Sequence, residues 1–255
     1  MLELNNVSVA YDKQLVVNKL SCSFHRYKIT TIIGPNGCGK STLLKALTKT
    51  KSLEQGTLKL MGKCMKTYKT KELAKLIALL PQNPHTPYSL TAKQLISLGR
   101  YPFQKWGRGL TKVDMNIIKR VIQQTNLTEL QHKYLHQMSG GEKQRAWIAM
   151  TLAQEPKLLI LDEPTTFLDI NHQYEILELV KSLNQELRIT VIMVLHDINQ
   201  AARYSDNIMV MKQGELIAHG EPKAIITKQL LKDVFEINAN VINDEYHNKP
   251  LVIPI

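Results

Sequence analysis

The chain has 255 residues, of which 44% are hydrophobic, and this is enough apolar material for a substantial core. No run of about 18 apolar residues is present, and the first five residues have no basic or apolar region, which argues against a membrane span or a secretion signal. The net charge of +11 fits a nucleic-acid surface, docking near acidic lipid headgroups, or simply scattered lysines, so charge alone does not choose a function.

The length favours one core that carries an inserted subdomain over two large domains. The odd number of cysteines, Cys22, Cys38 and Cys64, has no CxxC or zinc-like spacing. This pattern predicts reduced thiols and argues against a disulfide framework or a metal cluster.

In chain order, the predicted elements describe an α/β protein. Alternating residues in the N-terminal region and in a later segment predict a small antiparallel layer, short apolar runs predict buried strands of a parallel sheet, and two further segments predict a hairpin across Gln213-Gly214. The antiparallel layer is expected at Leu2–Val17 and Gly56–Met61, the buried strands at Ile29–Ile33, Leu76–Leu80, Leu158–Leu161 and Thr190–Leu195, and the hairpin at Asn207–Met211 and Glu215–Ala218.

Two regions predict helices. Residues 88–155 lack strand signals, which favours a helical insertion. The apolar residues Ile176, Leu177, Val180, Leu183 and Leu187 follow the spacing of an amphipathic helix.

The segment Gly34-Pro35-Asn36-Gly37-Cys38-Gly39-Lys40-Ser41-Thr42 fits GxxxxGK[ST] and stands between a predicted strand and a predicted helix. Its glycines let backbone N–H groups surround phosphates, while Lys40 neutralises the β- and γ-phosphates and the Ser41 hydroxyl can ligate Mg²⁺. Because a predicted strand and a predicted helix stand on either side of the motif, the context argues against a chance match and the segment predicts a phosphate-binding loop.

Two carboxylates, Asp162 and Glu163, follow the buried strand predicted at Leu158–Leu161. An acidic pair at such a place is costly unless a cation or hydrogen bonds compensate it. We expect Asp162 to meet Mg²⁺ and Glu163 to act as the base that polarises an attacking water.

The stretch Met138-Ser139-Gly140-Gly141-Glu142 predicts a helix start in which Ser139 and Glu142 form a capping box. Each glycine costs a helix about 1 kcal/mol relative to alanine. A helix start offers free N–H groups, and an anion approaches them most closely where no Cβ intervenes. The sequence therefore predicts a second phosphate-binding feature, with plain capping as the alternative.

Three further residues carry weaker signals by themselves. His196 follows a predicted strand at the sheet edge where ligands of open α/β sheets collect. Gln82 also follows a strand, and Tyr11 could present its ring to a base or simply pack.

Taken together, these stretches resemble the nucleotide-binding subunit of an ATP-binding cassette (ABC) transporter over essentially the whole chain. In that family's terms, Tyr11 is the adenine-stacking aromatic, Gly34 to Thr42 the Walker A loop, Gln82 the Q-loop, Met138 to Glu142 the signature, Leu158 to Asp162 the Walker B strand, Asp169 the D-loop and His196 the switch histidine.

The resemblance implies a fold and a set of site residues. The fold is a P-loop NTPase parallel-sheet core with an N-terminal antiparallel β subdomain, together about 1–87 and 156–255, and an inserted helical subdomain at about 88–155, forming a single ATPase domain over 1–255. Catalysis would use Lys40, Gln82, Glu163 and His196, and Mg²⁺ would be held by Ser41, Gln82 and Asp162. ATP would be contacted by Tyr11, Gly34, Pro35, Asn36, Gly37, Cys38, Gly39, Lys40, Ser41, Thr42, Ser139, Gly140, Gly141 and Glu142.

The same resemblance implies partners. A head-to-tail homodimer would hold each ATP between Lys40 of one copy and Ser139 to Gly141 of the other. Integral-membrane permease subunits would receive the motion through the Q-loop region and the segment from about Ser89 to Arg100, and a substrate-binding lipoprotein would take part indirectly. The chain would lie on the cytoplasmic face of the cell membrane.

One position departs from the family pattern, whose signature begins with Leu and ends with Gln where this chain has Met138 and Glu142. Because a carboxylate would repel a phosphate, we expect Glu142 to turn back toward the cap of Ser139.

A narrower resemblance concerns the cargo. Gly99-Arg100-Tyr101-Pro102, Arg145 to Met150, Glu163 to Ile170 and the closing Pro250 to Pro254 look like the ATPases of bacterial ferric-siderophore, haem and cobalamin importers. Ferric siderophore is the cargo expected first. Haem, cobalamin, a nucleic-acid-directed ABC ATPase and a weak regulatory ATPase stay open as alternatives. DNA-repair ATPases carry long coiled-coil insertions, but no sustained heptads appear between Lys40 and Ser139, and the chain has a single Walker A loop. No nucleic-acid partner is therefore expected.

Overall fold

The computed structural model describes residues 1–12, 14–84, 89–105 and 107–255. Its internal contacts divide the chain into two compact units. One unit combines Met1–Thr67 with Thr190–Ile255, and the other is Tyr68–Ile189. The subdomain boundary expected between residues 87 and 88 falls outside the described residues.

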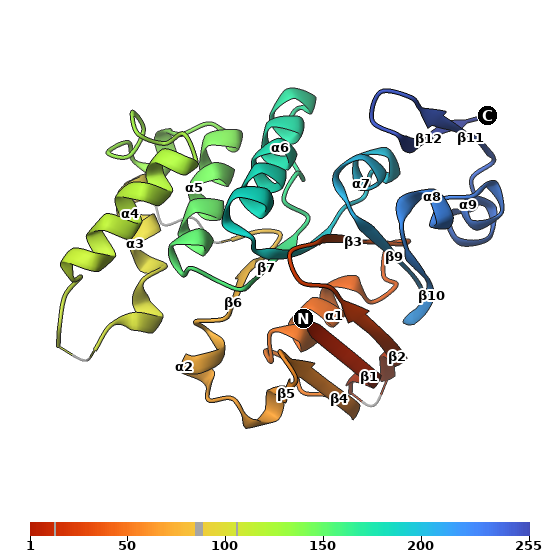
Figure 1. Ribbon diagram of the computed structural model, residues 1–255, viewed down its shortest axis with the longest axis horizontal. Helices are drawn as coiled ribbons and strands as arrows, with labels where there is room; N and C mark the ends of the chain where they lie inside the picture. Colours follow the sequence, from red (N-terminus) through yellow and green to blue (C-terminus); the bar gives the residue numbers. More distant parts are fainter. Residues whose placement is uncertain (13, 85–88, 106) are drawn as a thin grey trace. The chain divides into compact units, whose positions relative to one another are not determined.

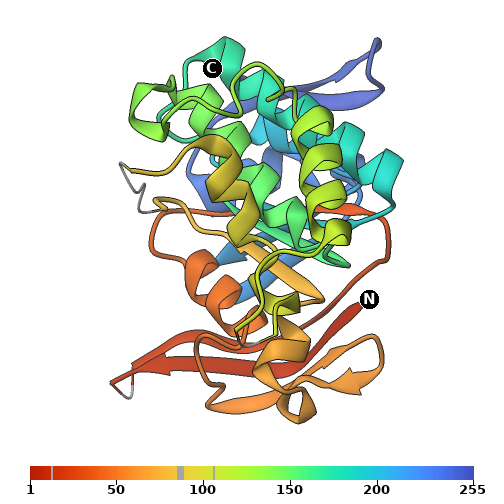
Figure 2. The same cartoon turned by 90° about the vertical axis from the view of Figure 1, so that its left-hand side faces the viewer.

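The first unit begins with the predicted antiparallel layer (Figure 2). The N-terminal region forms two long strands, of which the second continues to Phe24, beyond the predicted end at Val17. Alternate side chains such as Leu2 and Leu4 are buried, as the alternation predicts. The strand order is β2-β1-β4-β5, with the bounds β1 Leu2–Tyr11, β2 Gln14–Phe24, β4 Gln55–Leu60 and β5 Lys63–Cys64.

The parallel strands of this unit centre on β3 (Ile29–Ile33), whose five residues are all buried. β3 pairs in parallel with β8 (Thr190–Val194) on one side and with β9 (Asn207–Lys212) on the other. β10 (Glu215–Gly220) pairs antiparallel with β9, which confirms the predicted hairpin across Gln213-Gly214. α1 (Lys40–Leu47) follows β3 and packs against β1 and β2.

A C-terminal hairpin was not expected from the sequence. β11 (Ala239–Asp244) and β12 (Lys249–Pro254) pair antiparallel and lie beside α7 (Ile198–Tyr204) (Figure 1). The Asn199 side chain of α7 fixes this contact, because its Oδ1 accepts from the Val252 N–H at 2.7 Å and its Nδ2 donates to the Val252 carbonyl at 3.0 Å. Between β10 and β11 lie α8 (Pro222–Ile225) and α9 (Lys228–Phe235).

The second unit contains the other two predicted buried strands, β6 (Ile77–Leu80) and β7 (Leu158–Asp162), which pair in parallel. Between them the described residues form helices, as predicted, and their strand-like pairing is limited to an isolated bridge from Thr91 to Tyr134. α3, α4 and α5 pack together (Figure 1). The helical elements of the unit are α2 Thr70–Leu73, α3 Ala92–Leu98, the 3₁₀ turn Tyr101–Phe103, α4 Lys112–Gln124, the 3₁₀ turn Leu135–Gln137, α5 Gly140–Ala153 and α6 Ile170–Leu187.

The amphipathic helix predicted around Val180 is α6, which buries Ile176, Leu177, Val180 and Leu183. Leu187 is the exception, since it is 36% exposed. The helix ends there because Arg188 adopts a left-handed conformation with φ of 49°.

Within the described ranges, no helix has both the length and the apolar character needed to cross a bilayer. Cys22, Cys38 and Cys64 are free thiols.

Candidate functional site

The predicted phosphate loop follows β3 and ends in the first turn of α1. Gly37 and Gly39 have φ of 74° and 101°, conformations that other residues adopt only with strain. A Cβ on Gly34 would lie 2.8 Å from the Cys38 sulfur and closer still to the Met211 carbonyl oxygen. These glycines are therefore required by the backbone conformation of the loop and by its close approach to β9, whether or not a ligand is bound.

Lys40 is folded back over this loop. Its side chain is buried, and its ammonium donates to the carbonyl oxygens of Gly34 at 2.8 Å and Pro35 at 3.0 Å. These carbonyls compensate a cation that would otherwise be costly to bury. An anion held by the loop's N–H groups could take over this role, so the geometry suits a phosphate.

The turn of the β9–β10 hairpin supports the loop. Gly214 donates its N–H to the Cys38 carbonyl at 3.0 Å, and its own carbonyl accepts from the Asn18 N–H at 2.9 Å. Gly214 has φ of 82°, and a Cβ there would press on the backbone of Val16. Sequence reasoning found this turn but not its contact with the phosphate loop, because nothing in the local pattern reports a contact between residues so far apart.

The other face of the loop lines a cavity of about 370 Å³ with the end of α9. Burial raises the pKa of the Cys38 thiol in this loop. The cavity is lined by Pro35, Asn36, Gly37, Cys38, Lys212, Gln213, Val234, Phe235 and Glu236.

Tyr11 and His196 belong to the same unit as the loop. Tyr11 ends β1 with 37% of its surface exposed, and the Lys51 ammonium lies 4.1 Å from the centre of its ring, a cation–π contact. His196 is exposed two residues after the end of β8. Asp197 follows it and caps α7 by accepting from the Gln200 N–H at 2.8 Å.

In the second unit, the ends of β6 and β7 bring Gln82 and Glu163 together. The Gln82 side-chain amide donates to a Glu163 carboxylate oxygen, and the Thr166 hydroxyl donates to the same oxygen at 3.1 Å. The Glu163 side chain is buried, and its backbone is left-handed with φ of 52°, an uncommon conformation for a residue other than glycine. This geometry orients one carboxylate oxygen through two donors, as a positioned base requires. Asp162, one residue earlier, is the last residue of β7 and is half-buried.

The predicted capping box at the start of α5 is confirmed. The Glu142 N–H donates to the Ser139 hydroxyl at 3.2 Å, and the Ser139 N–H donates to a Glu142 carboxylate oxygen at 2.8 Å. Lys133 donates to the same oxygen at 3.0 Å. The hydrogen bond from the Ser139 N–H, followed by the Lys133 contact, lowers the pKa of Glu142. The carboxylate thus turns back to the cap, as expected.

The two glycines of this helix start differ. Gly140 is exposed, and a Cβ there would meet only the flexible end of Leu168 at 3.2 Å. Gly141 is buried, and a Cβ there would lie 2.9 Å from Cγ of the His172 ring and closer still to Cδ2. Gly141 therefore has a packing reason within the chain, whereas Gly140 does not.

His172 is held in place by Asp169. The His172 Nδ1 lies 2.8 and 2.7 Å from the two Asp169 carboxylate oxygens, and the His172 N–H donates to the same carboxylate at 3.0 Å, so that Asp169 caps α6. The backbone hydrogen bond from His172 lowers the pKa of Asp169. The sequence singled out Asp169 but not His172, because nothing in the local pattern places an imidazole against Gly141.

Comparison with known proteins places this geometry in context. A match to the family described as ABC transporter covers residues 17–166. The chain is 42% identical over 252 residues to the iron(3+)-hydroxamate import ATP-binding protein FhuC of Bacillus subtilis, covering 99% of this chain and 94% of that protein. It is 39% identical over 253 residues to the petrobactin import ATP-binding protein FpuD of Bacillus anthracis, covering 99% and 93%. Among solved structures, the ATP-binding cassette MJ0796, a dimer in a post-hydrolysis state bound to ADP and Pi, superposes with a TM-score of 0.74 at 27% identity, covering 87% of this chain and 98% of that one.

Proposed function

The chain belongs to the ABC transporter family and is an ATPase, and we propose that it is the ATP-hydrolysing subunit of a bacterial importer of ferric siderophores. The observation that carries this proposal is the identity of about two residues in five, over nearly the whole chain, with ATP-binding proteins of hydroxamate and petrobactin import. A haem or cobalamin cargo is the alternative that the uptake experiment below distinguishes.

Nucleotide binding is assigned to the loop Gly34–Thr42 and to Tyr11. When phosphates enter the loop, Lys40 exchanges the Gly34 and Pro35 carbonyls for the β- and γ-phosphate oxygens. The ring of Tyr11 stacks on the adenine, and the cation–π contact with Lys51 fixes the orientation of the Tyr11 ring.

Mg²⁺ fits the donor set that the sequence singled out. Ser41 offers a hydroxyl, Gln82 an amide oxygen and Asp162 a carboxylate, all hard oxygen donors of the kind that Mg²⁺ takes together with phosphates and water. Among the described residues, no three His, Cys, Asp or Glu side chains are grouped so that they could hold a metal ion by themselves. When bound, the ion would neutralise phosphate charge.

Water activation is assigned to Glu163. Gln82 and Thr166 donate to one of its carboxylate oxygens and hold the side chain in place, so that the carboxylate can accept a proton from a water that attacks the γ-phosphate. His196 is assigned the remaining catalytic role, which is to contact the γ-phosphate. Because Gln82 contacts the base directly, movement of the Q-loop changes how the base is held.

A second copy of the chain completes the site. Ser139 and Gly140 at the start of α5 present N–H groups and the positive end of a helix to the γ-phosphate bound by the partner. ATP thereby favours the closed dimer over the open one, and this difference in affinity drives the conformational change.

The cassette works with integral-membrane permease subunits, since importers of this family operate through such partners. We place it on the cytoplasmic face of the cell membrane, with a substrate-binding lipoprotein delivering the chelate on the other side. No nucleic-acid partner is part of the proposal.

Uptake measurements test the proposed function. Cells that lack the gene are complemented with the unaltered chain or with Glu163→Gln, and uptake of radioiron is measured from a ferric hydroxamate, a ferric catecholate and haem, with labelled cobalamin in parallel. The unaltered chain should restore uptake of a siderophore and the variant should not. Restored uptake of haem or cobalamin alone, or equal uptake with both chains, would contradict the proposal.

A further inference from the structure

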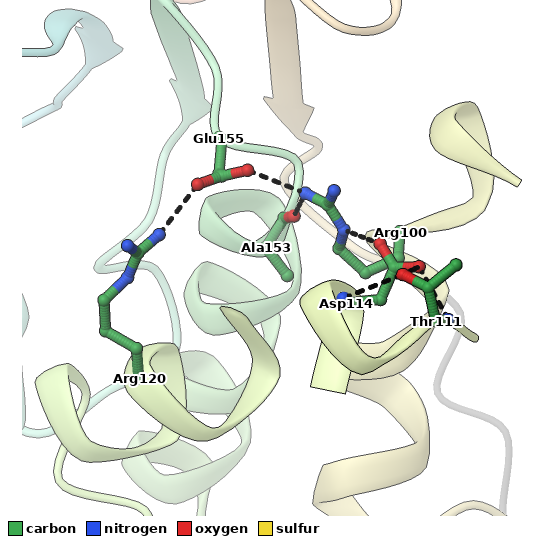
Figure 3. A network of polar contacts seen from close by, with 6 residues as sticks. All are labelled: Arg100, Thr111, Asp114, Arg120, Ala153 and Glu155. Atoms are coloured by element: carbon green, nitrogen blue, oxygen red, sulfur yellow. Dashed lines mark hydrogen bonds and ion pairs between the residues drawn. The ribbon is translucent and has the colours of Figure 1, made fainter. Parts of the chain in front are cut away.

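One buried guanidinium connects several helices of the second unit (Figure 3). Arg100 follows Gly99 at the end of α3, and its side chain is only 4% exposed. Its Nε donates to Asp114 at 2.8 Å, while its Nη1 donates to the Ala153 carbonyl at 2.7 Å and to Glu155 at 3.1 Å. The guanidinium also stacks over the ring of Phe103, 3.9 Å from its centre.

The acceptors lie at two helix ends, with Asp114 at the start of α4 and both Ala153 and Glu155 at the end of α5. Asp114 lies in the first turn of α4, where its other oxygen accepts from the Thr111 N–H at 2.9 Å and from the Thr111 hydroxyl at 2.6 Å. Ala153 is the last residue of α5, and a helix C-terminus carries unpaired carbonyls and partial negative charge. Arg100 thus neutralises a buried carboxylate and caps α5 with one planar group.

Gly99 brings α3 into direct contact with α5. A Cβ at this position would lie 2.9 Å from the Cβ of Ala153 and closer still to the Met150 carbonyl oxygen. The end of α3 is therefore pressed against the last turn of α5 without room for sliding. On either side of this contact, Leu98 is 51% exposed and Tyr101 is 75% exposed.

We propose that Arg100 is a positioning residue that locks the exposed Leu98–Tyr101 edge to α5, so that a force on this edge moves the whole helix. α5 has 14 residues and is about 21 Å long, and its other end carries the Ser139 cap and Gly140. The proposal rests on the proposed function, because it makes this edge the place where the membrane partner's movement enters the cassette and reaches the phosphate-binding helix start.

Arginine is required for geometric reasons. The lysine ammonium is a single point charge on a flexible stem, whereas the guanidinium presents fixed donors in several directions. Lys at position 100 could neutralise Asp114 but could not also bind the Ala153 carbonyl in the same orientation. Arg100→Lys would therefore keep the positive charge but lose the connection between α4 and α5.

The network supplies a matched control. Arg120 donates to the other oxygen of Glu155 at 2.8 Å, but its side chain is 53% exposed. In Figure 3 its dashed contact runs to Glu155 and not to Ala153 or Asp114. Arg120→Lys therefore makes the same chemical change in the same network without touching the helix end. The double variant Arg100→Met with Asp114→Asn keeps the cluster neutral and serves if Arg100→Lys does not fold.

The experiment compares the two lysine variants in two assays. In the first, backbone amide exchange is measured on the purified chain, and Arg100→Lys should speed exchange in the last turn of α5 at least tenfold while Arg120→Lys changes it less than twofold. In the second, uptake of the radioiron chelate that the unaltered chain transports is divided by the ATPase rate of the purified chain. Arg100→Lys should lower this ratio at least fivefold with kcat and KM for ATP within twofold of normal, and Arg120→Lys should not.

Unchanged exchange with Arg100→Lys would overturn the locking contact. If Arg100→Lys leaves the ratio of uptake to ATPase rate unchanged, including the case in which both fall equally, the role of Arg100 in transmitting movement from the membrane partner is overturned. If the unaltered chain takes up no chelate at all, the proposed function fails, and the exchange assay still decides whether Arg100 locks α3 to α5.

Discussion

Replacing each glycine of the α5 start by alanine separates packing from phosphate binding. Gly141→Ala would place a methyl group 2.9 Å from Cγ of His172 and closer to Cδ2, so the ring must move. The ring is held by Asp169 through contacts of 2.8 and 2.7 Å, and crowding of this kind costs about 1–3 kcal/mol. Gly140→Ala meets only the end of Leu168 at 3.2 Å, which can rotate away.

The gain in helix propensity from glycine to alanine is similar in both variants, so it cancels in the comparison. Gly141→Ala should therefore be less stable than Gly140→Ala by about 1–3 kcal/mol. For a chain of this size, this corresponds to a melting temperature lower by about 2–12 °C in a thermal unfolding assay. His172→Ala should restore most of the stability of Gly141→Ala, because it removes the ring that the methyl meets.

ATP turnover gives the complementary result. Gly140→Ala should fold normally but hydrolyse ATP at least fivefold more slowly, because its methyl group stands between the helix N–H groups and the partner's phosphate. Equal melting temperatures for the two alanine variants, or no rescue by His172→Ala, would refute the packing argument. Normal turnover in Gly140→Ala would refute the phosphate argument.

Three further predictions concern other parts of the chain. Lys40→Ala should weaken ATP binding at least tenfold in a fluorescence titration, whereas Glu163→Gln should keep binding within threefold and abolish phosphate release; turnover at the normal rate in Glu163→Gln would exclude it as the base. Lys51→Met should weaken ATP binding about two- to fivefold and leave tripolyphosphate binding unchanged, since a cation–π contact of about 0.5–1 kcal/mol holds the ring of Tyr11; equal losses for both ligands would contradict that role. The hydrogen bond from the Thr111 hydroxyl, followed by the Thr111 backbone and Arg100 contacts, lowers the pKa of Asp114. The ionised carboxylate therefore stabilises the fold above the ordinary carboxyl pKa of 3.8, and this stabilisation is lost as the pH falls through the lowered pKa of the folded state. Asp114→Asn should lack this acid-dependent loss of stability, and identical acid-unfolding profiles for the variant and the unaltered chain would contradict the prediction.

Local sequence patterns predicted much of the fold. β3 has its predicted bounds, and the strands β6, β7 and β8 differ from theirs by one residue at one end. The capping box of Ser139 and Glu142 was also predictable, because its partners are three residues apart. The C-terminal hairpin was missed, since Pro250 and Pro254 interrupt the strand signal of β12.

Contacts between distant residues were not predictable. Arg100 meets Ala153 across 53 positions of the chain, and Gln82 meets Glu163 across 81. Single-sequence patterns carry no information about such pairs. The site residues could be named from their types and spacing, whereas the donors that orient Glu163 and the ring that fills the space beside Gly141 required the structure.

The central claim is that ATP joins two copies of this chain, and the mass of Glu163→Gln in solution tests it most directly. Light scattering should give 29.1 kDa without nucleotide and twice that mass with ATP and Mg²⁺, and Lys40→Ala in the same background should abolish the increase. A mass that stays at 29.1 kDa while ATP is bound would contradict the account.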